Sequence, residues 1–215
     1  MNIISPDWPA PENIRALVTT RNTVIEHLSL PSEPILLKQV HGSHIILADD
    51  IKPGEIIEAD GLYTQSINKI CGVKTADCLP VLICDKKGTC VAAIHAGWRG
   101  LASGIIEATL EKLPVKSENL LAWLGPAIGP EVFEVGEDVR ERFPDDKLAF
   151  RTITEKISEK KYLCDIYLLA RKRLNNYGVT DIYGGTECAY SHREKFYSYR
   201  QKDTGRMLSL VWISR

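Results

Sequence analysis

Short apolar runs closed by turn-forming residues are the sequence feature that most limits how this chain can fold. Runs of this length and β-branched character, bounded by glycine, proline, aspartate or asparagine, are typical of strands. We predict strands at 35–40, 44–48, 70–74, 79–84, 91–95, 120–124 and 207–213. None of the runs approaches the roughly 18–20 apolar residues that a membrane-spanning helix requires. The sequence therefore predicts a strand-rich protein with no part in a membrane.

Helical spacing of apolar residues adds a small number of helices. We predict one over 99–113, ended by Pro114, a second that begins at Asp165 and ends before Gly178, and a shorter one over 136–143. Strands mixed with few helices favour α+β layering over strict alternation. We therefore expect an α+β fold, a layered α/β sandwich with a mixed β-sheet and a few flanking helices. No repeat or linker divides the chain, so we expect a single catalytic domain over 1–215.

Charge and cysteine content restrict the partners and the compartment. The 27 Lys and Arg residues against 28 Asp and Glu residues give a net charge of −1, which removes the electrostatic argument for nucleic-acid binding. The N-terminal residues lack the basic start and apolar stretch of a secretory signal. A chain of 215 residues with six cysteines can build its own core without disulfides, so we expect reduced thiols and a cytoplasmic protein. The oligomeric state is left open.

Two histidines and one cysteine occupy the ends of predicted strands. His41 and His95 each lie at the end of a strand and are followed closely by glycine, and Cys78 lies at the start of the next strand. Strand ends followed by glycine present side chains to clefts, because glycine permits sharp turns and close ligand approach. Two imidazoles and a thiolate suit a catalytic zinc site with one open position. The same residues also suit a Cys/His nucleophile pair or, on position alone, ordinary structural roles.

Familiar catalytic motifs do not separate these interpretations. Zinc nucleobase deaminases carry H-x-E with a downstream P-C-x-x-C, and His95 is followed by Ala96 and Gly97 instead. The chain also lacks H-E-x-x-H, G-x-S-x-G and the P-loop motif. These absences exclude the metalloprotease, hydrolase-elbow and P-loop classes.

Six ordered blocks resemble those of the polyphenol oxidoreductase (laccase-like) family, also described as purine nucleoside phosphorylase-like and as peptidoglycan editing factor. The blocks are Gln-Val-His-Gly at 39–42, Ala-Asp-Gly-Leu at 59–62, Thr-Ala-Asp-Cys-Leu-Pro at 75–80, His-Ala-Gly-Trp-Arg-Gly at 95–100, Leu-Gly-Pro-Ala-Ile-Gly at 124–129 and Phe-Tyr-Ser-Tyr-Arg at 196–200. The resemblance runs from about residue 35 to the end. Together the blocks are far more specific than any one of them.

The resemblance implies zinc held by His41, Cys78 and His95, the residues that strand-end reasoning selects. It also implies phosphorolysis of purine nucleosides (adenosine, inosine, guanosine and methylthioadenosine) and hydrolytic deamination of adenosine.

Phosphate binding calls for guanidinium groups, and Arg99 at the start of a predicted helix is the first candidate, ahead of Arg200 and Arg206. Asp77 is a candidate general acid or base, or a partner of a ligand imidazole. Because strand residues alternate faces, Asp77 and Cys78 point apart unless the backbone turns there. Cys188 is interpreted as structural or pocket-lining.

Three further functions use the same residues. The peptidoglycan-editing description implies an amidase that removes L-Ser from UDP-MurNAc-L-Ser. The laccase description implies a copper-dependent polyphenol oxidase, since one cysteine with two histidines suits copper as well as zinc. Five histidines in the whole chain are few for a multicopper centre, so copper ranks below zinc. In the third, Cys78 is a redox-sensing thiol tuned by the histidines.

Overall fold

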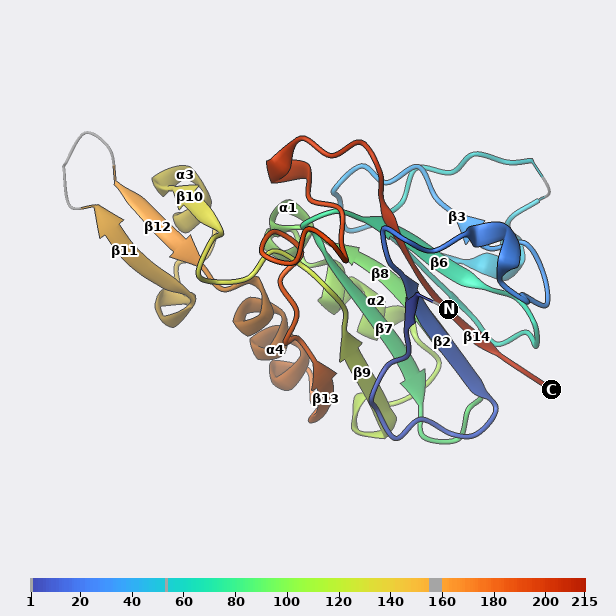
Figure 1. Ribbon diagram of the computed structural model, residues 1–215. Helices are drawn as coiled ribbons and strands as arrows, with labels where there is room; N and C mark the ends of the chain where they lie inside the picture. Colours follow the sequence, from blue (N-terminus) through green and yellow to red (C-terminus); the bar gives the residue numbers. More distant parts are fainter. Residues whose placement is uncertain (1, 53, 155–159) are drawn as a thin grey trace.

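The computed structural model describes residues 2–52, 54–154 and 160–215, and their strands form three sheets (Figure 1). The strands are β1 (Ile3–Ile4), β2 (Ile14–Thr19), β3 (Ile35–Leu36), β4 (Ile45–Leu47), β5 (Gly61–Thr64), β6 (Cys71–Thr75), β7 (Leu79–Asp85), β8 (Val91–Ala96), β9 (Leu120–Leu124), β10 (Glu134–Gly136), β11 (Phe150–Thr154), β12 (Lys161–Cys164), β13 (Asp181–Gly184) and β14 (Met207–Ile213). The α-helices are α1 (Trp98–Ala102), α2 (Ile105–Lys112), α3 (Glu137–Arg140) and α4 (Ile166–Asn176). Short 3-10 turns cover Ile25–His27, Ala48–Asp50, Ser117–Asn119, Lys147–Ala149 and Tyr199–Gln201.

The largest sheet has six strands in the order β13-β9-β7-β8-β5-β4. β7 lies near its centre, pairs antiparallel with both β8 and β9, and is buried along its whole length. Successive side chains of a strand point to opposite faces. Leu79, Val81 and Ile83 of β7 join the core beneath the helices, while Leu82 and Cys84 join a core on the other face. The sheet is therefore covered on both sides.

Helices cover one face of this sheet and a second sheet covers the other. α1, α2 and α4 lie on the helical side, and Figure 1 shows α2 and α4 packed beside β7, β8 and β9. The second sheet has five strands in the order β1-β2-β14-β6-β3. Both large sheets contain parallel and antiparallel pairs. The predicted fold class, a layered sandwich with mixed sheets and a few flanking helices, is confirmed.

A third sheet, β10-β12-β11, lies at one end of the molecule, apart from the two large sheets (Figure 1). Its inner residues Val135, Phe150 and Cys164 pack into the core beneath the helices. None of these three strands is among the seven predicted from sequence. Among the described helices, none combines the length and apolar character needed to cross a membrane.

The segment 99–113 forms two helices where the sequence predicts one. Gly104 adopts a left-handed conformation with φ of 83° and caps the start of α2, so the helix is interrupted after α1. The apolar face is nevertheless as predicted, because Leu101, Ile105 and Leu110 are all buried. The predicted helix over 136–143 was also too long, since α3 covers only Glu137–Arg140. The helix starting at Asp165 is confirmed, with the Asp165 carboxylate accepting from Leu168 N at 2.9 Å.

The predicted strand over 35–40 is shorter than expected. Only Ile35–Leu36 pairs as a strand, and Lys38 makes an isolated bridge to Glu58. Beyond it the chain turns away from the sheet, because the next backbone N–H groups donate to a buried carboxylate instead of to a neighbouring strand. His41 therefore lies in a turn and not at a strand end.

Candidate metal and substrate site

The three candidate ligands come together although they lie far apart in the sequence. His41 follows β3, Cys78 precedes β7, and His95 lies near the end of β8. β7 pairs with β8, so that Pro80 lies opposite His95 and Cys78 is brought beside it. One donor atom from each residue lies within 4.8 Å of the others, and the Cys78 Sγ to His41 Nε2 distance is 3.9 Å. Among the described residues this is the one His, Cys, Asp or Glu group of three that could hold a metal ion.

The turn that carries His41 is built around Asp60. His41 has a φ of 61°, a left-handed conformation that is uncommon for residues other than glycine. The Asp60 carboxylate accepts hydrogen bonds from His41 N at 2.9 Å and Gly42 N at 2.6 Å. It also lies 2.8 Å from His95 Nδ1, and its side chain is fully buried. One buried carboxylate thus contacts two of the three candidate ligands.

A second left-handed residue turns Asp77 and Cys78 toward the same cavity. Asp77 has a φ of 80°, which removes the simple alternation of a strand, so both side chains line one pocket. Asp77 Oδ2 accepts from Ser198 Oγ at 3.0 Å and from Arg200 N at 2.7 Å, while the buried Oδ1 has no partner. Burial raises the pKa of Asp77, and the hydrogen bonds from Arg200 and Ser198 oppose this only in part.

Gly97 gives Cys78 and His41 the space that they occupy. A Cβ at this position would lie 3.0 Å from Cys78 Sγ and 3.2 Å from His41 Cδ2. The backbone itself is ordinary, with a φ of −67°, so the requirement for glycine here comes from space alone.

We expect Gly97→Ala to weaken metal binding while the fold is retained. A methyl group would displace two donor-bearing side chains, and disturbed ligand orientation typically costs about 10–100-fold in metal affinity. Gly129→Ala is the matched control, because its Cβ would lie 3.1 Å from the Sγ of Cys188, a similarly tight contact with a thiol that borders a different cavity. Zinc competition titrations of both variants check this, and equal affinities would contradict it.

The electrostatics of the group favour a thiolate at Cys78. Burial alone would raise the pKa of this thiol, but hydrogen bonds and charge from His41 and His95 outweigh burial and lower it to about 7. Burial would lower the pKa of His95, and its hydrogen bonds to Asp60 and Cys78 instead raise it to about 9. Both shifts follow from pairing a thiolate with an imidazolium, which stabilises each charge.

This pairing predicts selective alkylation in the metal-free protein. Because the Cys78 pKa is lowered to about 7, its reaction rate with iodoacetamide is expected to rise mainly between about pH 6 and pH 8. Burial raises the pKa of Cys84, Cys90 and Cys164 to about 12, so these thiols are expected to stay unmodified. Mass spectrometry in a Cys188→Ser background measures the site of reaction. A midpoint above pH 8.5, near that of a free thiol, would contradict the thiolate assignment.

The three residues lie on a cavity of about 610 Å³ that also carries basic and aromatic side chains. The basic side chains on its wall are Lys74, Arg99, Arg200 and Arg206, and the aromatic ones are Trp98, Phe133 and Tyr199. Arg99 stacks on the Trp98 ring at 4.3 Å and Arg200 lies over Phe133 at 5.8 Å. Every arginine predicted from sequence as a phosphate contact therefore borders the same cavity as the candidate ligands.

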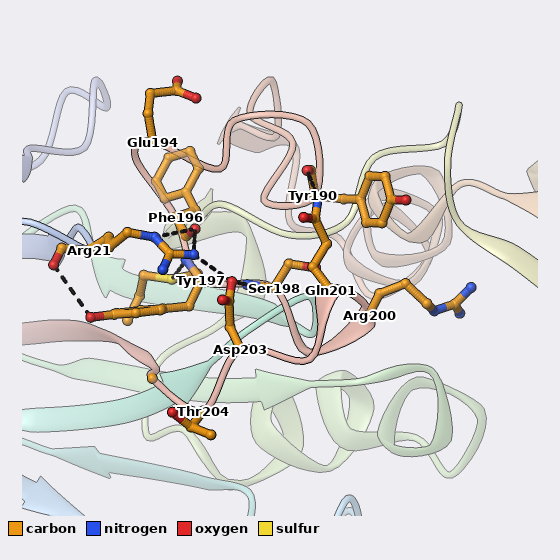
Figure 2. Close-up of polar contacts among 12 residues, drawn as sticks. Arg21, Tyr190, Glu194, Phe196, Tyr197, Ser198, Arg200, Gln201, Asp203 and Thr204 are labelled. Carbon is orange, nitrogen blue, oxygen red and sulfur yellow. Dashed lines mark hydrogen bonds and ion pairs between the residues drawn. The ribbon is translucent and has the colours of Figure 1, made fainter.

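Arg200 belongs to the segment 196–206, here called the closing segment, and Arg21 holds this segment in place through three side-chain contacts. Arg21 donates to the Phe196 carbonyl and to the Asp203 carboxylate, and its guanidinium stacks on Tyr197 (Figure 2). Figure 2 shows the Arg200 side chain pointing away from this network. The segment is thus held in place, and the Arg200 guanidinium, which donates to the Glu134 carbonyl at 3.2 Å, lies on the cavity wall.

Other residues singled out from the sequence lie elsewhere. Cys188 borders a separate cavity, where its Sγ accepts from Gly129 N at 3.2 Å and Ser191 N at 3.4 Å. His192 pairs with Glu187 at 3.0 Å. Neither joins the group of candidate ligands, which agrees with the structural interpretation of Cys188.

The donor set fits a single metal ion. Zinc bonds of about 2.3 Å to sulfur and about 2.0–2.1 Å to nitrogen place tetrahedral ligand atoms roughly 3.3–3.7 Å apart, close to the 3.9 Å between Cys78 Sγ and His41 Nε2. By ligand type, two imidazoles and a thiolate suit zinc or copper. A three-residue set leaves one tetrahedral position for substrate or water.

Comparison with known proteins now identifies the family. The model of the family described as multi-copper polyphenol oxidoreductase laccase matches residues 10–214. The chain belongs to this family. The resemblance found in the sequence is confirmed. The family description names several coppers, whereas the described residues bring together one three-residue group.

Relatives of this laccase-like family carry a different activity in their names. The purine nucleoside phosphorylase of Haemophilus influenzae is 41% identical and covers 99% of this chain and 100% of its own. Purine nucleoside phosphorylase YfiH of Escherichia coli is 41% identical with 98% coverage of both chains. A solved Neisseria meningitidis structure superposes with a TM-score of 0.90 at 38% identity, covering all of both chains. The chain is thus similar over its full length to proteins named as purine nucleoside phosphorylases.

Asp60 and Lys74 are site residues to which sequence reasoning assigned no role, and Asp60 has the larger part in the geometry. Asp60 appears in the sequence analysis only as part of the Ala-Asp-Gly-Leu block at 59–62. Its partners, His95 and the turn at 40–42, are distant in sequence, so no local pattern links them.

Proposed function

We propose that this protein is a zinc-dependent purine nucleoside phosphorylase that also deaminates adenosine. Its substrates would be adenosine, inosine, guanosine and methylthioadenosine. The observation that carries the proposal is one cavity bordered by His41, Cys78 and His95 and also by four basic side chains. The names of the full-length relatives support the phosphorylase part. The six cysteines are free thiols, which supports a cytoplasmic location.

The basic side chains are suited to hold inorganic phosphate beside the nucleoside. Inorganic phosphate is an anion at neutral pH, and guanidinium groups bind its oxygens in bidentate fashion. Arg99 and Arg200 are both steadied by aromatic rings on the cavity wall. Zinc, when bound, would supply a Lewis acid close to this anion.

Phosphorolysis also needs a proton for the departing base. A phosphate oxygen bonds to C1′ of the ribose as the C1′–N9 bond breaks, and the electron pair of that bond stays on the purine. Protonation of the purine makes it a better leaving group. Asp77 is the one carboxylic acid among the described residues that line the cavity, and its raised pKa favours the protonated form. We assign it the role of proton donor to the base.

Deamination makes a related demand on the same residue. Water adds to C6 of adenosine and ammonia leaves; of the two water protons, one ends on the departing amino nitrogen and the other on N1 of the purine. Asp77 is placed beside Cys78 on the cavity wall, where the protonated carboxyl could give its proton to N1 and the resulting carboxylate could accept a proton from the attacking water.

A phosphate-dependence assay tests this function. Zinc-loaded protein is incubated with adenosine, with and without inorganic phosphate, and adenine is resolved from inosine. We expect adenine only when phosphate is present and inosine in both conditions. A zinc-loaded protein that turns over no nucleoside would overturn the proposal.

A second candidate, amide hydrolysis of a nucleotide-linked peptidoglycan precursor, is favoured by one observation. A further cavity of about 630 Å³ shares Tyr199, Arg200 and Arg206 with the first and adds Lys202. A nucleoside does not need this outer basic region, whereas the diphosphate of UDP-MurNAc-L-Ser would occupy it. Release of L-Ser without any phosphate requirement would support the amidase in place of the phosphorylase.

A further inference from the structure

We infer that Asp60 positions two of the three metal ligands, His41 and His95, and that metal affinity depends on its carboxylate. The inference rests on the metal site of the proposed function but not on the reaction carried out there. Asp60 is a positioning residue in this account, because it contacts the ligands and not the metal.

The first contact fixes which nitrogen of His95 faces the site. Asp60 Oδ1 lies 2.8 Å from His95 Nδ1, and the two side chains are 0% and 4% exposed. A carboxylate accepts hydrogen bonds and does not donate them, so Nδ1 carries a proton and Nε2 is left for a metal. The backbone adds a second tie, since His95 N donates to the Asp60 carbonyl at 2.7 Å.

The second contact builds the turn that carries His41. Three consecutive N–H groups, those of Val40, His41 and Gly42, point at the Asp60 carboxylate at 3.2, 2.9 and 2.6 Å. This cradle holds His41 in its left-handed conformation, which a residue other than glycine adopts only when its surroundings impose it. Without the carboxylate, these three partly buried hydrogen bonds are lost, and no other hydrogen bond within the described ranges holds the backbone of the turn in this conformation.

The two contacts share one rigid anchor. Asp60 directly precedes β5, which is held between β4 and β8, and its own N–H donates to the His44 carbonyl at 3.0 Å. Mutation of a carboxylate that orients ligand imidazoles typically lowers metal affinity by about 10–100-fold. Asp60 orients the His95 imidazole directly, and it places the His41 imidazole by holding the His41 backbone. We therefore expect removal of the carboxylate to lower zinc affinity by an amount at the upper end of that range.

The chain offers a matched control in Asp85. This aspartate is also buried, at 2% exposure, and its carboxylate also accepts from three nearby backbone N–H groups, those of Lys87, Thr89 and Cys90. It lies at the far end of β7 from Cys78 and contacts none of the three ligands. Asp85→Asn therefore reproduces the loss of a buried carboxylate without touching the metal site.

The test measures zinc affinity by chelator competition for wild type, Asp60→Asn and Asp85→Asn, with cobalt absorption spectra as a report on ligand geometry. We expect zinc affinity to fall by about 10–100-fold in Asp60→Asn, with an altered cobalt spectrum, and to stay at the wild-type value in Asp85→Asn. Equal affinities for wild type and Asp60→Asn would overturn the inference. So would an equal loss in both variants, because that would show a general effect of stability.

A measurement on the wild type covers the case in which Asp60→Asn fails to fold. In zinc-loaded wild type, nitrogen-15 NMR should show that His95 keeps one ring proton, on Nδ1, in slow exchange with water. A proton on Nε2 would overturn the inference. Wild type that binds no zinc would overturn the metal site and the inference with it, whereas zinc binding without nucleoside turnover would contradict only the proposed function.

Discussion

Replacing Cys78 with alanine is expected to abolish zinc binding and turnover together. The variant removes the one sulfur donor and the one anionic ligand of the group, leaving two imidazoles 4.7 Å apart between ring centroids. Affinity should fall by more than the 10–100-fold typical of residues that only orient ligands. Loss of a metal that contributes several kcal/mol to the transition state corresponds to about 1,000-fold in rate.

Cys188→Ala is the control for this prediction. Cys188 is the other partly exposed cysteine, and its Sγ also accepts hydrogen bonds, but it borders a different cavity. Elemental analysis and nucleoside assays on both variants should show wild-type zinc and rates in Cys188→Ala alone. Full turnover by zinc-free Cys78→Ala would mean that the reaction needs neither the metal nor the thiolate.

Asp77→Asn is expected to lower kcat by about 10²–10⁴-fold, the range of general acid–base catalysis, while zinc stays bound. Asparagine tolerates left-handed backbone as aspartate does, and its carbonyl oxygen can still accept from Ser198 Oγ and Arg200 N. The amide in place of the partnerless Oδ1 cannot transfer a proton. The chemistry is therefore removed with little change in shape.

Zinc content and melting temperature distinguish this role from a structural one. Both should match wild type in Asp77→Asn, because Asp77 contacts the closing segment and no candidate ligand. A wild-type kcat would show that Asp77 moves no proton in the slow step. Loss of zinc from the variant would show that it acts by holding the turn beside Cys78.

The sequence predicted the centre of the fold better than its margins. The strands at 79–84, 91–95, 120–124 and 207–213 were found because each is a continuous apolar run, and the structure buries both of their faces. β13 was missed because its four residues are only partly buried and form a strand by pairing with β9 at the sheet edge. β5 was missed because it begins with glycine and is defined by its neighbours β4 and β8.

In the candidate site, too, features set by local sequence were predicted and features set by contacts distant in the sequence were not. His41, Cys78 and His95 were selected from glycine-flanked strand ends, and the structure brings them together. The strand predicted over 35–40 was too long, since the buried carboxylate of Asp60 accepts from the backbone donors near its end. The left-handed turn at Asp77 has no sequence signature, because aspartate adopts that conformation only where tertiary contacts support it.

The most direct test of this account is X-ray absorption at the metal edge of the zinc-loaded protein. We expect one sulfur at about 2.3 Å and two imidazole nitrogens at about 2.0–2.1 Å, with the remaining position filled by a light atom. Any zinc that Cys78→Ala still retains at high metal concentration should show no sulfur in its shell. A zinc shell without sulfur in the wild type would contradict the assignment of His41, Cys78 and His95 as one metal centre.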